Sequence, residues 1–149
     1  MPYRHTIKVD ILSSAPSGSP LYSTLDSAGM DLRASCAYPI TIPPNATVEI
    51  PLGFAMELPS GYAMLILSRS GLGVKGINVA NGVGLVDADY RGIVKVFLRN
   101  TSGQDFIVNN GDRIAQGVII GLPLVHVRNV DKLSPTKRGE GGFGSTGIS

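Results

Sequence analysis

Residues 47–58 read TVEIPLGFAMEL, and this stretch decides the fold class. Every second residue in it is apolar, in the order Val48, Ile50, Leu52, Phe54, Met56 and Leu58. Side chains of an extended chain point alternately to its two faces, so a period of two places all of them on one face. The stretch therefore predicts β-structure with one buried face, and it argues against a helix.

The same alternation returns on both sides of this stretch. It is seen in Ile7, Val9 and Ile11 near the start, and again in Val94, Val96 and Leu98. Turn-forming pairs recur at spacings of roughly ten to twenty residues, among them Pro43-Pro44, Ser102-Gly103 and Asn110-Gly111. Only SGLGVKG at 70–76 leaves room for a short helix, which its glycines weaken. We expect an all-β, single-domain antiparallel β-sandwich or barrel with at most one short helix and a flexible C-terminal tail.

The length and composition fit one domain. A chain of 149 residues buries roughly two thirds of its unfolded surface and needs no second domain. We expect a single domain over 1–149, with a β core at 1–137 and a glycine-rich C-terminal segment at 138–149. The formal net charge of +2 and the lack of a long Lys/Arg run argue against a nucleic-acid partner.

Three features bear on the compartment. The longest apolar stretch, GVIIGLPLVHV at 117–127, is broken by Pro123 and His126 and falls short of the ~20 residues of a membrane helix. The stretch MPYRHTIKVDIL has charges among its apolar residues and no signal-peptide core. The single cysteine, Cys36, cannot form an intrachain disulfide or a zinc site by itself, and we expect it to be a buried small apolar residue. We expect a soluble, cytoplasmic protein without a membrane partner.

Polar residues gather in five segments, mostly at the ends of the expected strands. They are AGMDLRA (28–34), LSRSGL (67–72), NGVGLVDADYRG (81–92), GDRIAQ (111–116) and RGEGGFGSTG (138–147). We expect the third to be a hairpin, and the fifth combines a cation, an aromatic ring and two hydroxyls with five glycines. Each segment alone has a structural explanation: turn chemistry, a helix start, a surface ion pair or a loose tail.

Together, in this order and at these spacings, the five segments resemble the five motifs of the trimeric dUTPase family. The resemblance covers nearly the whole chain, and the third and fifth segments carry it with the highest specificity. It implies the β-clip fold of that family and the hydrolysis of dUTP to dUMP and pyrophosphate by attack of water on the α-phosphorus. It also implies Mg²⁺ as cofactor, and a metabolic role in limiting uracil incorporation into DNA and supplying dUMP for dTMP synthesis.

The resemblance assigns three residues to the reaction itself. Asp87 is the base that activates water, a role that typically contributes about 10²- to 10⁴-fold. Ser70 brings its hydroxyl to the scissile bridge, and Arg138 reaches the γ-phosphate from the tail. Asp31 would contact Mg²⁺ through water, while the triphosphate mainly holds the ion. The further residues implied in substrate binding are Arg69, Gly71, Asn81, Gly84, Tyr90, Gln116, Phe143, Gly144 and Ser145.

The third and fifth segments would select the substrate. A tight hairpin at 81–92 would exclude a 5-methyl group, and Tyr90 would leave no room for a 2′-hydroxyl. The Asn81 amide can flip between donor and acceptor, so the backbone of the hairpin must separate uracil from cytosine. Phe143 would stack over the uracil while Ser145 and the glycines fold onto the phosphates, so that the tail, 138–149, acts as a lid.

The resemblance further implies a homotrimer. Each site would combine the first, second and fourth segments of one chain, the third of a neighbour and the tail of the third chain. Two alternatives stay open: a dCTP deaminase-like enzyme, whose family uses a glutamate at the base, and a non-enzymatic nucleotide-binding regulator of the same fold. A complete set of candidate catalytic positions at 69, 70, 87, 116 and 138 favours an enzyme over a regulator.

Overall fold

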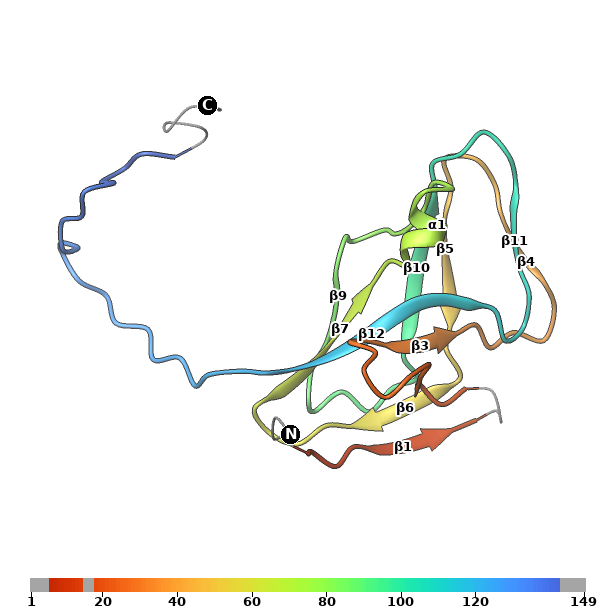
Figure 1. Ribbon diagram of the computed structural model, residues 1–149, viewed down its shortest axis with the longest axis horizontal. Coiled ribbons are helices and arrows are strands. Elements are labelled where there is room, and N and C mark those ends of the chain that lie inside the picture. The colour runs from red at the N-terminus through yellow and green to blue at the C-terminus, as the bar shows by residue number, and fades with distance from the viewer. Residues whose placement is uncertain (1–5, 15–17, 143–149) are drawn as a thin grey trace.

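The computed structural model describes residues 6–14 and 18–142 (Figure 1). Within these residues the chain forms twelve strands and one four-residue helix, α1 (Ser70–Gly73), so the all-β prediction and the position of the short helix are confirmed. The strands are β1 (Asp10–Ser13), β2 (Leu21–Tyr22), β3 (Met30–Arg33), β4 (Ile40–Ile42), β5 (Thr47–Pro51), β6 (Phe54–Glu57), β7 (Tyr62–Leu67), β8 (Ile77–Val79), β9 (Gly84–Val86), β10 (Lys95–Asn100), β11 (Phe106–Val108) and β12 (Arg113–Gly121).

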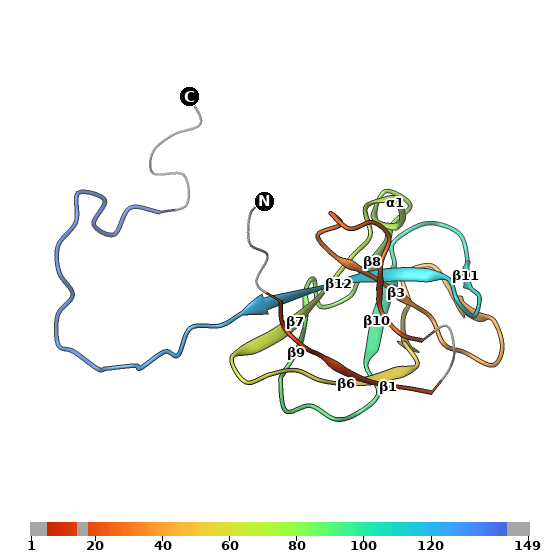
Figure 2. The same cartoon turned by 60° about the horizontal axis from the view of Figure 1, so that its bottom comes forward.

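The described strands pair antiparallel in four small sheets. The largest has the order β2-β3-β12-β7-β9, a second has the order β5-β10-β8, and β1-β6 and β11-β4 form two-stranded ribbons. Figures 1 and 2 show these sheets folded around each other, with β12 crossing the middle of the largest one. Strands far apart in the sequence therefore become neighbours: β12 lies between β3 and β7.

The stretch 47–58 has its apolar face buried, as expected, but it is not one strand. Ile50, Phe54 and Met56 are almost fully buried. The stretch breaks at Gly53, whose φ of +72° favours glycine, and a Cβ there would lie 2.6 Å from the Ser35 side chain. The break sends β5 to pair with β10 and β6 to pair with β1. The alternation thus continues across two different sheets.

The other two alternating runs differ in burial. Val96 and Leu98 on β10 are buried, in agreement with the expectation. Near the N-terminus the apolar residues are only half-buried, because β1 pairs with β6 alone and covers the core from outside. The expectation for Cys36 was wrong: the residue is half-buried in a loop, where its backbone N–H donates to Asn110 Oδ1 at 3.1 Å.

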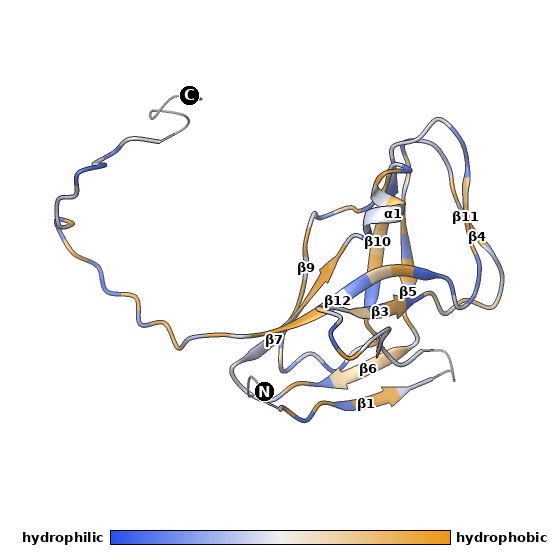
Figure 3. Ribbon diagram, in the orientation of Figure 1, coloured by the Kyte–Doolittle hydropathy of each residue, from blue (hydrophilic) through white to orange (hydrophobic). Residues whose placement is uncertain are grey.

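The chain beyond β12 forms an extended arm, residues 122–142, which leaves the sheets and runs away from them in Figures 1 and 2. Apolar and polar residues alternate along it (Figure 3), and Leu124 and Val127 are 86% and 87% exposed. The last strand ends at Gly121, and the proposed core boundary at residue 137 lies inside the arm. Among the described residues, no helix is long and apolar enough to cross a membrane.

Candidate active site

A polar cavity of about 350 Å³ opens where β3, β7 and β12 meet. It brings together the first, second and fourth of the predicted segments. The pairing explains this convergence, because Gln116 on β12 lies opposite Asp31 of β3 on one side and opposite Leu67 of β7 on the other. The lining residues are Ser23, Ser27, Ala28, Gly29, Asp31, Arg69, Ser70, Gly71 and Gln116.

Asp31 is the electrostatic centre of the cavity. Its Oδ2 accepts hydrogen bonds from Ser23 Oγ at 2.7 Å and from Arg113 Nη1 at 3.3 Å, and its Oδ1 lies 3.6 Å from Arg69 Nε. Burial raises the pKa of the Asp31 carboxyl, but the Ser23 hydrogen bond and the charges of Arg113 and Arg69 outweigh it and hold the pKa below its ordinary value of 3.8. The carboxylate is therefore ionised at neutral pH.

The second segment turns from β7 into α1 at the cavity. Arg69 adopts an extended backbone conformation immediately before the helix, and its Nη1 donates to the Arg113 carbonyl at 3.0 Å. Ser70 and Gly71 follow in the first turn and are exposed. Apart from its chain neighbours and the backbone of its own helix, no part of the described chain comes within 4 Å of a Cβ built at Gly71, so there is open space beside the cavity. A ligand could approach this backbone closely.

Gln116 is held in a defined orientation. Its Nε2 donates to the Ser68 carbonyl at 3.0 Å. The close approach of Gly29 also depends on a missing side chain, since a Cβ there would lie 3.3 Å from Gln116 Oε1. An amide NH₂ group has two donors, so one hydrogen of Gln116 Nε2 is available to a bound anion.

The third segment lies away from this cavity. Its strand β9 pairs with β7 at the edge of the sheet, and the Tyr90 N–H donates to the Asp87 carbonyl at 3.2 Å to close a turn. The expected hairpin at 81–92 is therefore wrong, because β9 pairs with β7 instead of with a second strand of the segment. Asn81 and Asp87 are exposed, and neither lines the cavity.

Two residues of the third segment have structural roles in the single chain. Gly84 packs flat on β7, where a Cβ would lie 3.0 Å from the Ile66 Cβ. The Tyr90 hydroxyl donates to the Ile93 carbonyl at 3.1 Å, and its side chain is otherwise accessible, since the residue is 44% exposed. The assignment of both residues to substrate binding stays a prediction.

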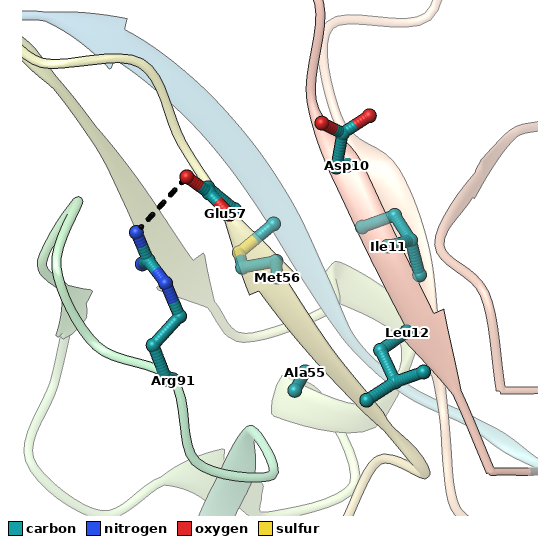
Figure 4. Close-up of a pocket in the computed structure, with 7 residues that line it drawn as sticks. All are labelled: Asp10, Ile11, Leu12, Ala55, Met56, Glu57 and Arg91. Atoms are coloured by element: carbon teal, nitrogen blue, oxygen red, sulfur yellow. Dashed lines mark ion pairs between the residues drawn. The ribbon is translucent and has the colours of Figure 1, made fainter.

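Arg91 ties this turn to the body of the protein, at a hollow lined by the paired strands β1 and β6 (Figure 4). Its Nη1 donates to the Ala88 carbonyl at 2.7 Å and its Nη2 lies 3.3 Å from Glu57 Oε1. The rest of that hollow is mostly apolar, with Ile11 and Met56 on its walls, and it contains none of the predicted site residues. Arg91 therefore anchors the turn that carries Asp87.

The fifth segment lies on the arm. Arg138 is exposed, and its Nε donates to the Gly141 carbonyl at 2.7 Å within the arm itself. Gly139, at φ +52°, closes a turn with Thr136 through a backbone hydrogen bond of 3.2 Å. Three predicted substrate-binding residues lie outside the described residues, namely Phe143, Gly144 and Ser145.

Ser23 and Arg113 contact Asp31, and neither is predicted as a site residue from the sequence. Ser23 precedes the first segment, and no local pattern marks it. Arg113 lies within GDRIAQ, but an odd spacing from Gln116 would place the two side chains on opposite faces of a regular strand. The structure places them on the same face.

The carboxylates of the cavity bear on metal binding. Among the described residues that line it, Asp31 is the only Asp or Glu. Among the described residues there is no group of three or more His, Cys, Asp or Glu side chains that could hold a metal ion. A single carboxylate suits a divalent ion that keeps most of its own waters, as Mg²⁺ usually does.

Comparison with known proteins places this geometry in a family. The dUTPase family model matches residues 16–147. The deoxyuridine 5′-triphosphate nucleotidohydrolase of Sinorhizobium medicae is 50% identical over 133 residues, which cover 87% of this chain and 83% of the relative. A family model that spans most of the chain and a relative at this identity agree with each other.

Solved structures show the same fold. The Staphylococcus bacteriophage 80alpha dUTPase with dUPNHPP has a TM-score of 0.86 at 24% sequence identity, covering 96% of this chain and 100% of that chain. A mutant dUTPase from the S. aureus phage phi11, reported with the coordination of a structural Mg(II) ion, has a TM-score of 0.77 at 20% identity, covering 87% of this chain and 100% of that chain. These likenesses confirm the predicted fold. The match to the family model and the sequence identity to the Sinorhizobium medicae relative show that the chain belongs to the dUTPase family.

Proposed function

We propose that this protein is a dUTP diphosphatase that hydrolyses dUTP to dUMP and pyrophosphate by attack of water on the α-phosphorus. The observation that carries the proposal is the cavity between β3, β7 and β12, which joins an ionised carboxylate to a guanidinium, a hydroxyl and an amide. Relatives named for this reaction share about half of the sequence. The fold neighbour with dUPNHPP shows that this scaffold accepts a dUTP analogue in that protein.

The triphosphate would occupy the cavity. Arg69, Ser70 and the Gln116 amide provide hydrogen-bond donors there, and charge-assisted hydrogen bonds to phosphate oxygens are stronger than neutral ones. Arg69 Nη1 donates to the Arg113 carbonyl, which holds the guanidinium at the cavity, while its Nε faces Asp31 at 3.6 Å, a distance too long for a strong hydrogen bond, so other N–H groups of Arg69 can donate to an incoming phosphate. Such fixed donors lower the barrier to phosphate-ester cleavage by stabilising charge as it develops.

The chain's own residues fit Mg²⁺ as cofactor. Asp31 would hold a water of the bound ion through Oδ1, because Oδ2 already accepts two hydrogen bonds. When bound, Mg²⁺ would neutralise charge on the triphosphate oxygens. The structural Mg(II) ion reported for the phi11 enzyme supports only that a protein of this fold can bind Mg²⁺.

The base and the base-recognition residues would come from a neighbouring copy. Asp87 and Asn81 do not line the cavity of their own chain, and Arg91 ties the turn that carries Asp87 to Glu57 of β6. The arm, to which Arg138 belongs, runs away from the sheets (Figure 1). A homotrimer, in which each site takes the third segment of a neighbour and the tail of the third chain, would reunite all five segments and cover the exposed arm.

The tail would close the site. With Asp87 as the base, Phe143 stacked on uracil and Gly144 and Ser145 near the phosphates, closure would exclude bulk water from the reaction. Tyr90 would sit against the sugar, and Gly84 and Gly71 would allow close approach of the backbone. In the cell, we propose a cytoplasmic enzyme that limits uracil incorporation into DNA and supplies dUMP for dTMP synthesis.

The decisive experiment measures pyrophosphate release from dUTP with Mg²⁺, and compares it with dTTP, dCTP and UTP. We expect turnover of dUTP and little turnover of the others. Ammonia release from dCTP would contradict the assignment, and so would the lack of pyrophosphate from dUTP. Light scattering at micromolar concentration should give the mass of a trimer, whereas a monomeric mass would contradict the shared site.

A further inference from the structure

We propose that Arg113 is a positioning residue of the site: its guanidinium holds Asp31 so that Oδ1 faces the cavity. The proposal rests on the proposed function of that cavity. Two independent observations carry it, one from the pairing of β12 with β3 and one from the contacts of the Asp31 carboxylate.

The first observation is a β-bulge. Gln116 lies opposite Asp31 and Ala115 opposite Leu32, but Arg113 lies opposite Arg33, so the register shifts between Arg113 and Ala115. The bulge absorbs one residue, Ile114, which is 2% exposed. As a result Ile114 and Ala115 are consecutive buried residues, which a regular strand with one buried face does not show.

The bulge moves Arg113 to the outer face of the strand. Asp31 and Arg33 share the outer face of β3, while Leu32 between them is fully buried. Since Arg113 lies opposite Arg33, its side chain joins Gln116 on the side of Asp31. Bulges of this kind re-aim side chains and are common beside active sites.

The second observation is that the two carboxylate oxygens of Asp31 have different partners. Oδ2 is occupied by Ser23 Oγ at 2.7 Å and Arg113 Nη1 at 3.3 Å. Oδ1 has a looser neighbour, Arg69 Nε, at 3.6 Å. The carboxylate is thus fixed on one oxygen and available on the other.

Arg113 acts from outside the cavity. It does not line the cavity that contains Asp31 and Arg69 but lines a neighbouring hollow of about 270 Å³, together with Leu72 and Phe106. Its carbonyl also accepts the hydrogen bond from Arg69 Nη1. One residue therefore supports two cavity residues, Asp31 through its side chain and Arg69 through its backbone.

This arrangement contributes little to folding stability. The Arg113 side chain is 47% exposed, and ion pairs with such exposed partners stabilise proteins only weakly. The ion pair between Arg113 and Asp31 therefore acts by fixing the position of the carboxylate, because small displacements of a group that must contact a substrate have large effects on rate.

The test compares Arg113→Gln with Arg33→Gln. Arg33 is the matched control, because it carries the same charge on the same face opposite Arg113 and donates to the Gly111 carbonyl at 2.9 Å. Within the described part of the chain, it forms no hydrogen bond or ion pair with Asp31. We expect Arg113→Gln to lower kcat/KM for dUTP by about ten- to a hundredfold, the usual effect of losing a partner that orients a ligand residue. Arg33→Gln should change it by less than about twofold, and both proteins should keep the parent's thermal midpoint within a few degrees. Arg113→Lys, which keeps the charge but not the planar donor group, should recover part of the activity.

A double-mutant cycle separates positioning from direct substrate contact. If Arg113 acts through Asp31, adding Arg113→Gln to Asp31→Asn should cost less than about twofold further, because the group to be positioned has gone. Fully additive losses would show that Arg113 contacts the substrate itself, and would overturn the proposal. Equal losses in Arg113→Gln and Arg33→Gln would overturn it as well, since they would reflect net charge alone.

A binding measurement keeps the proposal separate from the proposed function. Calorimetry with the analogue dUPNHPP, with and without Mg²⁺, should show that Arg113→Gln weakens binding more with Mg²⁺ than without it, and that Arg33→Gln does not. The same loss under both conditions would overturn the positioning role. If the parent protein failed to hydrolyse dUTP, the proposed function would fail, while the cycle could still be read from analogue binding.

Discussion

Asp31, Arg69 and Gln116 meet where three adjacent strands of one sheet lie side by side, whereas Arg138 lies on an arm that leaves the sheets after Gly121. The first group is fixed by strand pairing within the chain. The arm has no strand of its own and exposes Leu124 and Val127 almost completely. The comparison teaches that one proposed site draws on two kinds of structure: a preformed cradle for the phosphates, and segments that gain a defined position only against another surface.

The largest effect is expected at Asp87, which belongs neither to the cradle nor to the arm. Its substitution tests whether a residue outside both regions takes part in the reaction. Asp87→Asn keeps the shape of the side chain and removes the base, so turnover of dUTP should fall by about 10²- to 10⁴-fold. Binding of dUPNHPP, measured by calorimetry, should stay close to that of the parent. A variant that keeps more than about a tenth of the parent turnover would show that Asp87 is not the base.

Removing the lid tests whether the tail is needed for the reaction but not for the fold. A chain that ends at Lys137 loses Arg138 and the glycine-rich segment, yet keeps every described strand. Turnover should fall by about a hundredfold, the scale of misplaced reacting groups. The thermal midpoint should barely change, because the described residues removed make no core contacts. An unchanged turnover and KM would show that residues 138–149 are a loose terminus.

A single substitution in the tail should give a smaller effect. Phe143→Ala removes the proposed stack on uracil but keeps Arg138 and the backbone donors. The expected loss is about 1 to 3 kcal/mol of base stacking, read from the KM for dUTP and from analogue affinity. Phe143→Tyr is the control that keeps an aromatic face. A loss of activity equal to that of the truncated chain would mean that the aromatic ring, and not the phosphate contacts, accounts for the effect of removing the tail.

The smallest expected effect concerns the cradle and pH. The pKa of Asp31 is lower in the folded protein than its ordinary 3.8, so its ionised form stabilises the fold above about pH 4. That contribution should disappear as the pH falls through the lower, folded pKa. Urea unfolding of the parent and of Asp31→Asn should therefore converge in free energy at acid pH and differ modestly at pH 7. Curves that stay parallel from pH 7 to about pH 2 would contradict the lowered pKa.

The sequence predicts the architecture well where residue patterns are local. The alternation at 47–58 predicts β-structure with a buried face, and SGLGVKG at 70–76 predicts the short helix. It does not show that Gly53 would divide the first stretch between two sheets, because the alternation of apolar residues continues through Gly53 and reveals neither its φ of +72° nor the close approach of Ser35. The hairpin expected at 81–92 does not form, because β9, the strand within that segment, pairs with β7 from an earlier part of the chain.

For the site, family resemblance leads further than periodicity. It identifies Asp31 and Gln116, and the pairing of β3 with β12 then brings them together. Periodicity gives the wrong face for Arg113, since a bulge depends on the partner strand as well as on its own sequence. Residues 81–92 and the arm could not be placed against the cavity by the chain alone, because their proposed partners are other copies.

The position of β12 also has a consequence for how the chain reaches its fold. Arg113–Gly121 is the last described strand in the sequence, yet it lies between β3 and β7 at the centre of the largest sheet. During synthesis on the ribosome, β3 and β7 emerge long before the strand that must join them, and their facing edges wait unpaired. Long-range pairing of this kind slows folding and leaves strand edges open to wrong partners. A pause in translation before residue 113 should therefore promote aggregation of the nascent chain.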